Sequence, residues 1–206
     1  MTTLLSRGTP PGPREAPPDA VLARRGTVLV VAAGCALLAA RPALVPGRGD
    51  PTAVLVGIFV VLLAAGGLWP LTQPTGRTAP RAAGLMAAGP VLAVGLAAFG
   101  VGRLVSHGAA PLPFTGTVVA LNTLAAVAEE AFFRRLVYGT LAHHGPVLAG
   151  LGSAVLFAAV HVTVYGAWVL PLDLAAGLVL SWQRWATGSW TVPAVTHAVA
   201  NLLVVL

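Results

Sequence analysis

The chain has 206 residues, of which 57% are hydrophobic and only 9% charged, and its formal net charge is +6. A soluble domain rarely falls so far below the usual ~25% of charged residues, so this composition excludes an ordinary soluble domain and favours a membrane protein. The arginines stand singly or in pairs at the ends of apolar segments, which is typical of membrane topology and argues against nucleic-acid binding. Cys35 is the only cysteine, which excludes a disulfide framework and a cysteine-based metal site.

The apolar residues come in blocks that are long enough to cross a bilayer as helices. Residues 1–26 are rich in proline, glycine and arginine and are predicted to form a disordered cytoplasmic tail. The predicted spans lie at about residues 27–45, 51–71, 84–105, 115–142, 146–165, 167–186 and 190–206. The sequence therefore predicts an all-α, polytopic transmembrane helical bundle of about seven spans.

The first half of the chain is interpreted as a scaffold. Residues 27–45 could also be a cleaved signal peptide, because the apolar part is short and ends in small residues. We favour a retained helix, since several spans follow it. The arginine distribution places the N-terminus in the cytoplasm, and we expect a multi-pass protein of a bacterial inner or plasma membrane. Residues 27–114 hold no acid or histidine inside a span, so the chemistry is expected in residues 115–206, between the last four helices.

Two adjacent acids, Glu129 and Glu130, lie inside the fourth predicted span. Charges are costly to bury in a membrane and usually mark a functional site. Glu130 precedes Arg134 by four residues, which is the favourable order for an ion pair on a helix. Glu129 points about 100° away around the helix, so it is the less neutralised carboxylate and the candidate base. Arg135 is interpreted as an anchor that reaches the headgroups.

Gly145 lies midway between Glu129 and His161. If the chain forms an antiparallel hairpin about this glycine, the two side chains lie at the same depth. With Tyr138 taken as a marker of the membrane interface, Glu129 lies about 14 Å deep at the α-helical rise. A histidine that merely hydrogen-bonds a neighbouring helix is the alternative for His161.

The last predicted span carries His197 and, one turn further on the same face, Asn201. With Trp190 as the second interface marker, His197 lies about 10 Å deep. Asn201 could instead join two helices by a hydrogen bond. We expect both residues to meet the acid pair and His161 in one pocket nearer the cytoplasmic face.

These residues form three motifs in a fixed order: Glu-Glu-x-x-x-Arg at 129–134, Phe-x-x-x-His at 157–161 and His-x-x-x-Asn at 197–201. Together they resemble the CAAX prenyl protease 2 family, also called the CPBP or Abi family of intramembrane proteases. The resemblance covers about residues 115–206. Arg135 departs from the family pattern, which often has glycine at this position.

The resemblance implies an intramembrane endopeptidase that hydrolyses a peptide bond of a membrane-associated protein or peptide. In this family, the residues that match Glu129 and His161 activate a water. Those that match His197 and Asn201 stabilise the oxyanion. Those that match Glu130 and Arg134 form a supporting pair. The substrate need not be prenylated, because a chain rich in glycine and arginine is expected to be bacterial and would then not meet prenylated CAAX proteins.

A catalytic zinc is the open alternative for the cofactor. Glu129, His161 and His197 could supply three ligands and leave the fourth position to water. The sequence lacks the His-Glu-x-x-His helix of the zincins. We favour a reaction without metal.

Two other functions remain open. A proton-coupled transporter could use the glutamates and histidines as a relay, although such proteins usually contain internal repeats. A catalytically inactive membrane binding or immunity protein would keep the same fold. Asp173, the remaining acid of residues 115–206, is interpreted as a helix-start residue.

Overall fold

The computed structural model describes residues 18–45, 49–71, 85–105 and 114–203, and this part of the chain contains helices and no strand. The all-α prediction is confirmed. The elements are α1 (Pro18–Ala39), α2 (Arg41–Leu44), α3 (Thr52–Leu68), α4 (Leu85–Val105), α5 (Gly116–Glu130), η1 (Ala131–Val137), α6 (Tyr138–Leu141), η2 (Ala142–His144), α7 (Pro146–Tyr165), η3 (Ala167–Val169), α8 (Leu170–Thr187) and α9 (Thr191–Leu202).

Each predicted span overlaps at least one of these helices, and the protein is integral to the membrane. The helical segments long and apolar enough to cross a bilayer are Val21–Ala39, Gly116–His144 and Pro146–Tyr165, and shorter apolar helices cover Thr52–Leu68 and Ala88–Leu104. The count of seven spans therefore stays a prediction.

The first helix begins earlier than the sequence predicted. α1 starts at Pro18, so residues 18–26 are helical and do not belong to a disordered tail. Proline is favoured at the first position of a helix, because its missing N–H has no helical partner there. Residues 1–17, where the tail was also predicted, lie outside the described residues.

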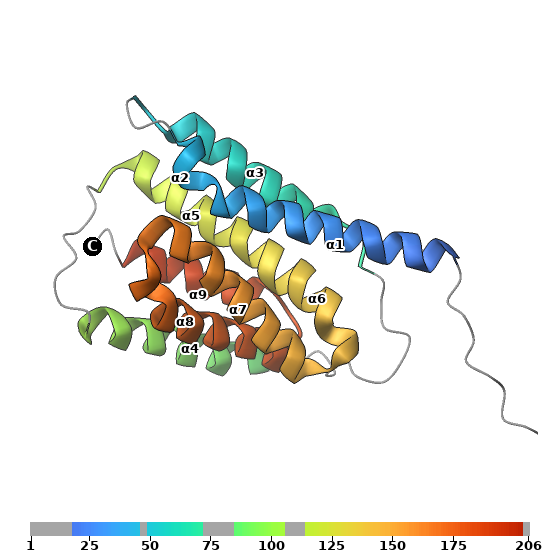
Figure 1. The fold of residues 1–206 in the computed structure, drawn as a ribbon. Helices are drawn as coiled ribbons and strands as arrows, with labels where there is room; N and C mark the ends of the chain where they lie inside the picture. The colour runs from blue at the N-terminus through green and yellow to red at the C-terminus, as the bar shows by residue number, and fades with distance from the viewer. Residues whose placement is uncertain (1–17, 46–48, 72–84, 106–113, 204–206) are drawn as a thin grey trace, which may run out of the picture.

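The centre of the bundle is one long helical segment formed by α5, η1 and α6 (Figure 1). α3 packs along α5 and η1 on one side, α7 and α9 pack on the other, and α1 contacts both α7 and α3. α8 packs against α7, and α4 contacts α8 and α9 at the far side of the bundle. The central segment therefore touches both halves of the chain.

The middle of this segment, η1, is a π-helical stretch. π-Helical stretches are rare in proteins, but those that occur are often found at functional sites. The wider turn changes the direction of the side chains and leaves backbone carbonyls without helical partners. Neighbouring side chains bind two of these carbonyls: the Ser153 hydroxyl donates to Phe133 O at 2.8 Å, and Arg184 Nε donates to Arg134 O at 3.1 Å. The irregular turn follows directly after the acid pair and is held by α7 and α8.

Arg135 holds α3 against this turn. Its guanidinium donates to Gly66 O at 2.5 Å and to Trp69 O at 3.2 Å, at the end of α3 where carbonyls lack helical partners. The interpretation of Arg135 as a headgroup anchor was therefore wrong. The side chain turns inward because the end of α3 offers it carbonyl acceptors.

Gly66→Ala should destabilise the protein, whereas Gly67→Ala should not. A Cβ at Gly66 would overlap the backbone of Ala131, while a Cβ at Gly67 would meet no atom within 4 Å. Overpacking of this kind costs about 1–3 kcal/mol, and alanine in place of a helical glycine with open space around it is favourable. Thermal unfolding in detergent, followed by circular dichroism, measures both. Equal midpoints would contradict the close contact between α3 and η1.

Candidate active site

The two adjacent carboxylates have different surroundings, as the helical spacing predicted. Glu130 and Arg134 are both 0% exposed and form an ion pair in which Arg134 Nη1 lies 2.9 Å from Glu130 Oε1. Arg134 Nη2 also donates to Gly177 O at 3.2 Å, and its guanidinium lies 4.5 Å from the centre of the Phe157 ring. Glu130 is thus neutralised inside the bundle.

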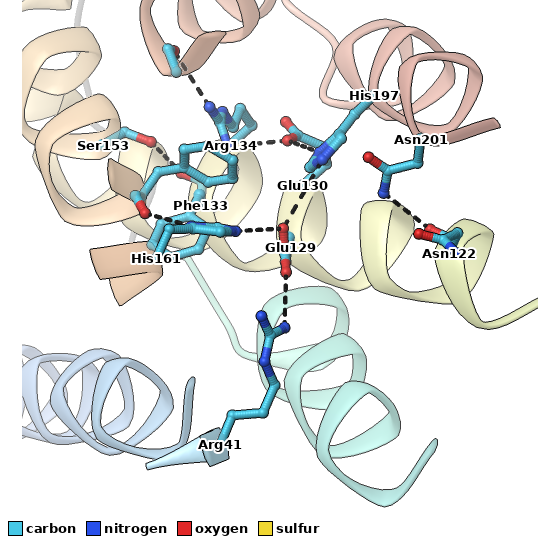
Figure 2. Close-up of polar contacts among 12 residues, drawn as sticks. Arg41, Asn122, Glu129, Glu130, Phe133, Arg134, Ser153, His161, His197 and Asn201 are labelled. Atoms are coloured by element: carbon cyan, nitrogen blue, oxygen red, sulfur yellow. Dashed lines mark hydrogen bonds and ion pairs between the residues drawn. The ribbon is translucent and has the colours of Figure 1, made fainter. Parts of the chain in front are cut away.

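Glu129 is 4% exposed and is surrounded by groups at longer range (Figure 2). Its Oε2 atom lies 3.7 Å from His161 Nε2 and 4.0 Å from His197 Nε2. These separations exceed the 2.7–3.2 Å of a protein hydrogen bond. The carboxylate oxygen therefore faces both imidazoles without a direct bond to either.

Both histidine rings are oriented through their Nδ1 atoms. His161 Nδ1 lies 2.7 Å from Phe157 O, and because a carbonyl only accepts, Nδ1 carries the proton. His197 Nδ1 lies 2.9 Å from Glu130 Oε1, which holds that ring in the same way. The hydrogen bond at one ring nitrogen fixes the role of the other, so each Nε2 atom is presented to Glu129.

Asn201 lies at the edge of this group. Its side-chain amide donates to the backbone oxygen of Asn122 at 3.2 Å and so joins α9 to α5 (Figure 2). The structure thus brings Glu129, His161 and His197 together, while Asn201 is engaged with a neighbouring helix.

The family comparison covers this part of the chain. A family model described as Rce1-like, Type II CAAX prenyl endopeptidase, matches residues 111–203, which contain all three motifs. Residues 111–203 belong to the Rce1-like family. This confirms the family resemblance found in the sequence. Neither the curated proteins nor the solved structures contain a match.

Arg41 lies outside the Rce1-like segment and still reaches the site. It opens α2, is 9% exposed, and places Nη1 at 3.9 Å from Glu129 Oε1 (Figure 2). The interpretation of residues 27–114 as scaffold alone was therefore incomplete. The available signal was an arginine that interrupts an apolar run just before a proline, Pro42.

Asp173 was also missed as a neighbour of the site. It lies in the first turn of α8, as expected of a helix-start residue. Its carboxylate also interacts electrostatically with the site, through His161, Glu129 and His197. Its Oδ2 atom is buried and has no hydrogen-bond partner among the described residues.

Tyr138 lies inside the bundle. It is 5% exposed, and the guanidinium carbon of Arg184 lies 5.4 Å from the centre of its ring. The helical segment continues beyond it to His144, about 20 Å from Glu129 at the helical rise. The depth of the site in the membrane stays a prediction.

The side chains around Glu129 can be compared with those of a metal site. The described residues contain no group of three or more His, Cys, Asp and Glu side chains arranged to hold a metal ion. The nearest set is Glu129, His161 and His197, whose Nδ1 bonds resemble those of metal-binding histidines. The guanidinium of Arg41 beside Glu129 opposes a second cation there, because like charges repel.

Proposed function

We propose that the chain is an intramembrane endopeptidase that hydrolyses a peptide bond of a membrane-associated protein or peptide without a metal ion. The observation that carries the proposal is the buried Glu129 carboxylate facing two oriented imidazoles within an Rce1-like segment. The arginine distribution supports a cytoplasmic N-terminus. A bacterial cell membrane is part of the same proposal.

In the proposed reaction, Glu129 and His161 activate a water. A water at about 2.8 Å from each partner can bridge atoms separated by 3.7 Å. Glu129 Oε2 takes a proton from it while His161 Nε2 orients it, and the resulting hydroxide attacks the peptide carbonyl carbon. Glu129 then gives the proton to the departing amide nitrogen as the C–N bond breaks.

His197 is the proposed donor to the oxyanion. Its Nδ1–H is committed to Glu130, so Nε2 carries a proton only when the ring is an imidazolium. In this proposal the ring is protonated. Its two nitrogens lie 4.0 Å from Glu129 Oε2 and 2.9 Å from Glu130 Oε1, so a carboxylate faces each N–H.

Asn201 is the proposed second donor. Donors aimed at the developing negative charge commonly supply the largest part of the rate enhancement in acyl transfer. In the structure the Asn201 amide bonds to Asn122 O, so its rotation toward the substrate would have to break that bond. We therefore expect a smaller effect from Asn201→Ala than from loss of His197.

The activity is tested with purified protein in lipid vesicles and a library of membrane-tethered reporter peptides, with products mapped by mass spectrometry. The proposal predicts peptide products with wild type and none with a Glu129→Gln/His161→Ala double variant. Identical products from both would refute it. Proton flux without cleavage would favour a transporter instead, and binding without cleavage an inactive binding protein.

Chelation should leave the activity intact. The proposed base, Glu129, acts on water directly and Arg41 already supplies a cation beside it. The measurement is cleavage of one reporter peptide before and after exhaustive dialysis against a strong chelator. Loss of activity that only added zinc restores would overturn the metal-free mechanism and support Glu129, His161 and His197 as ligands.

A further inference from the structure

Arg41 has a setting that membrane topology does not explain. An arginine that marks the end of a span normally extends to the headgroups and stays hydrated. Arg41 is instead 9% exposed, with its guanidinium carbon 5.8 Å from the centre of the Phe59 ring on α3 and its Nη1 atom turned to Glu129. Burial of this charge next to the membrane interior is costly and calls for a specific partner.

The two oxygens of Glu129 face different groups. Oε1 lies 3.9 Å from Arg41, whereas Oε2 lies 3.7 Å and 4.0 Å from the two histidine Nε2 atoms. The last torsion of a glutamate side chain is broad, so a carboxylate with no short hydrogen bond can rotate. A cation on one side restricts that rotation and leaves the other oxygen toward the imidazoles.

Arg41 also differs from the other charged groups near Glu129. An arginine is always charged, whereas the charge of a histidine depends on its protonation. Arg134 neutralises Glu130 at 2.9 Å. Among the described residues, Arg41 is the permanent cation whose ion pair is with Glu129.

We propose that Arg41 is a positioning residue that holds Glu129 turned so that Oε2 faces His161 and His197. The inference rests on the proposed peptidase function. Arg41 lies at the junction between α1 and α2, outside residues 111–203. The Rce1-like segment alone therefore lacks one residue of the proposed reaction centre.

The kinetic test uses full-length protein in vesicles and one reporter peptide that the wild type cleaves. Arg41→Met lowers kcat on the order of 10- to 100-fold with little change in KM, because misplacement of the base affects the chemical step. Arg41→Lys restores much of the rate, since it restores the charge. Arg135→Met is the matched control: it also removes a partly buried arginine, but one that bonds the carbonyls of α3.

A second test measures the Arg41–Glu129 pair without any substrate. In a double-mutant cycle of thermal unfolding, Arg41→Met and Glu129→Gln are non-additive, because either change alone removes the pair. The control cycle of Arg135→Met with Glu129→Gln is additive. Additivity in the first cycle, or an unchanged kcat in Arg41→Met, overturns the positioning role even when wild type cleaves. Absence of cleavage by wild type overturns the proposed function, while the cycle still reports on the pair.

Discussion

Glu129→Gln should lower kcat for a reporter peptide by about 10²- to 10⁴-fold, which is the usual contribution of a general base. Glutamine keeps the shape of the side chain but cannot take a proton from water. Because Glu129 makes only long contacts of 3.7 to 4.0 Å, its replacement should lower the thermal midpoint much less than loss of the 2.9 Å pair of Arg134 and Glu130. The measurement pairs initial rates in vesicles with thermal unfolding of the same preparation.

His161→Ala is the companion variant and should lower kcat by a similar factor. His161 is held by Phe157 O and faces Glu129, so its removal leaves the base without the group that orients the water. Cleavage at the wild-type rate by Glu129→Gln would show that this carboxylate takes no part in the reaction. A loss of stability as large as that of Arg134→Met would instead show that Glu129 is a structural charge.

The parts of the site that the sequence could predict rest on short-range geometry. Helical periodicity places Glu130 and Arg134 on one face, and the structure has them 2.9 Å apart. A hairpin about Gly145 puts Glu129 and His161 at one depth, and their nearest side-chain atoms lie 3.7 Å apart. Both inferences need only a regular helix or one tight turn. Their roles in catalysis stay predictions.

The parts that could not be predicted depend on packing between distant helices. Arg41 approaches Glu129 only because α1 packs against α7 and α3, and no local sequence pattern predicts that arrangement. The π-helical stretch likewise depends on Ser153 and Arg184, which arrive from other helices to bind its carbonyls. Tyr138 could not be recognised as a buried residue from the sequence, because amphipathic aromatic residues occur both at interfaces and inside polar clusters.

Arg134→Met should destabilise the fold by about 3–5 kcal/mol, because it leaves the Glu130 charge buried without its cation. Both side chains are 0% exposed, so water cannot replace the lost partner. The change also removes the Gly177 contact to α8 and the cation beside Phe157. Thermal or denaturant unfolding in detergent measures the loss.

The double variant Arg134→Met/Glu130→Gln separates the ion pair from general packing. Replacing both charges of a buried pair is often nearly neutral, so the double variant should regain much of the stability that Arg134→Met loses. It should nevertheless cleave more slowly than wild type, since His197 Nδ1 then faces an amide in place of the carboxylate at 2.9 Å. If the double variant is as unstable as Arg134→Met, packing of the guanidinium outweighs its charge. The supporting role of Glu130 and Arg134 would then be structural only.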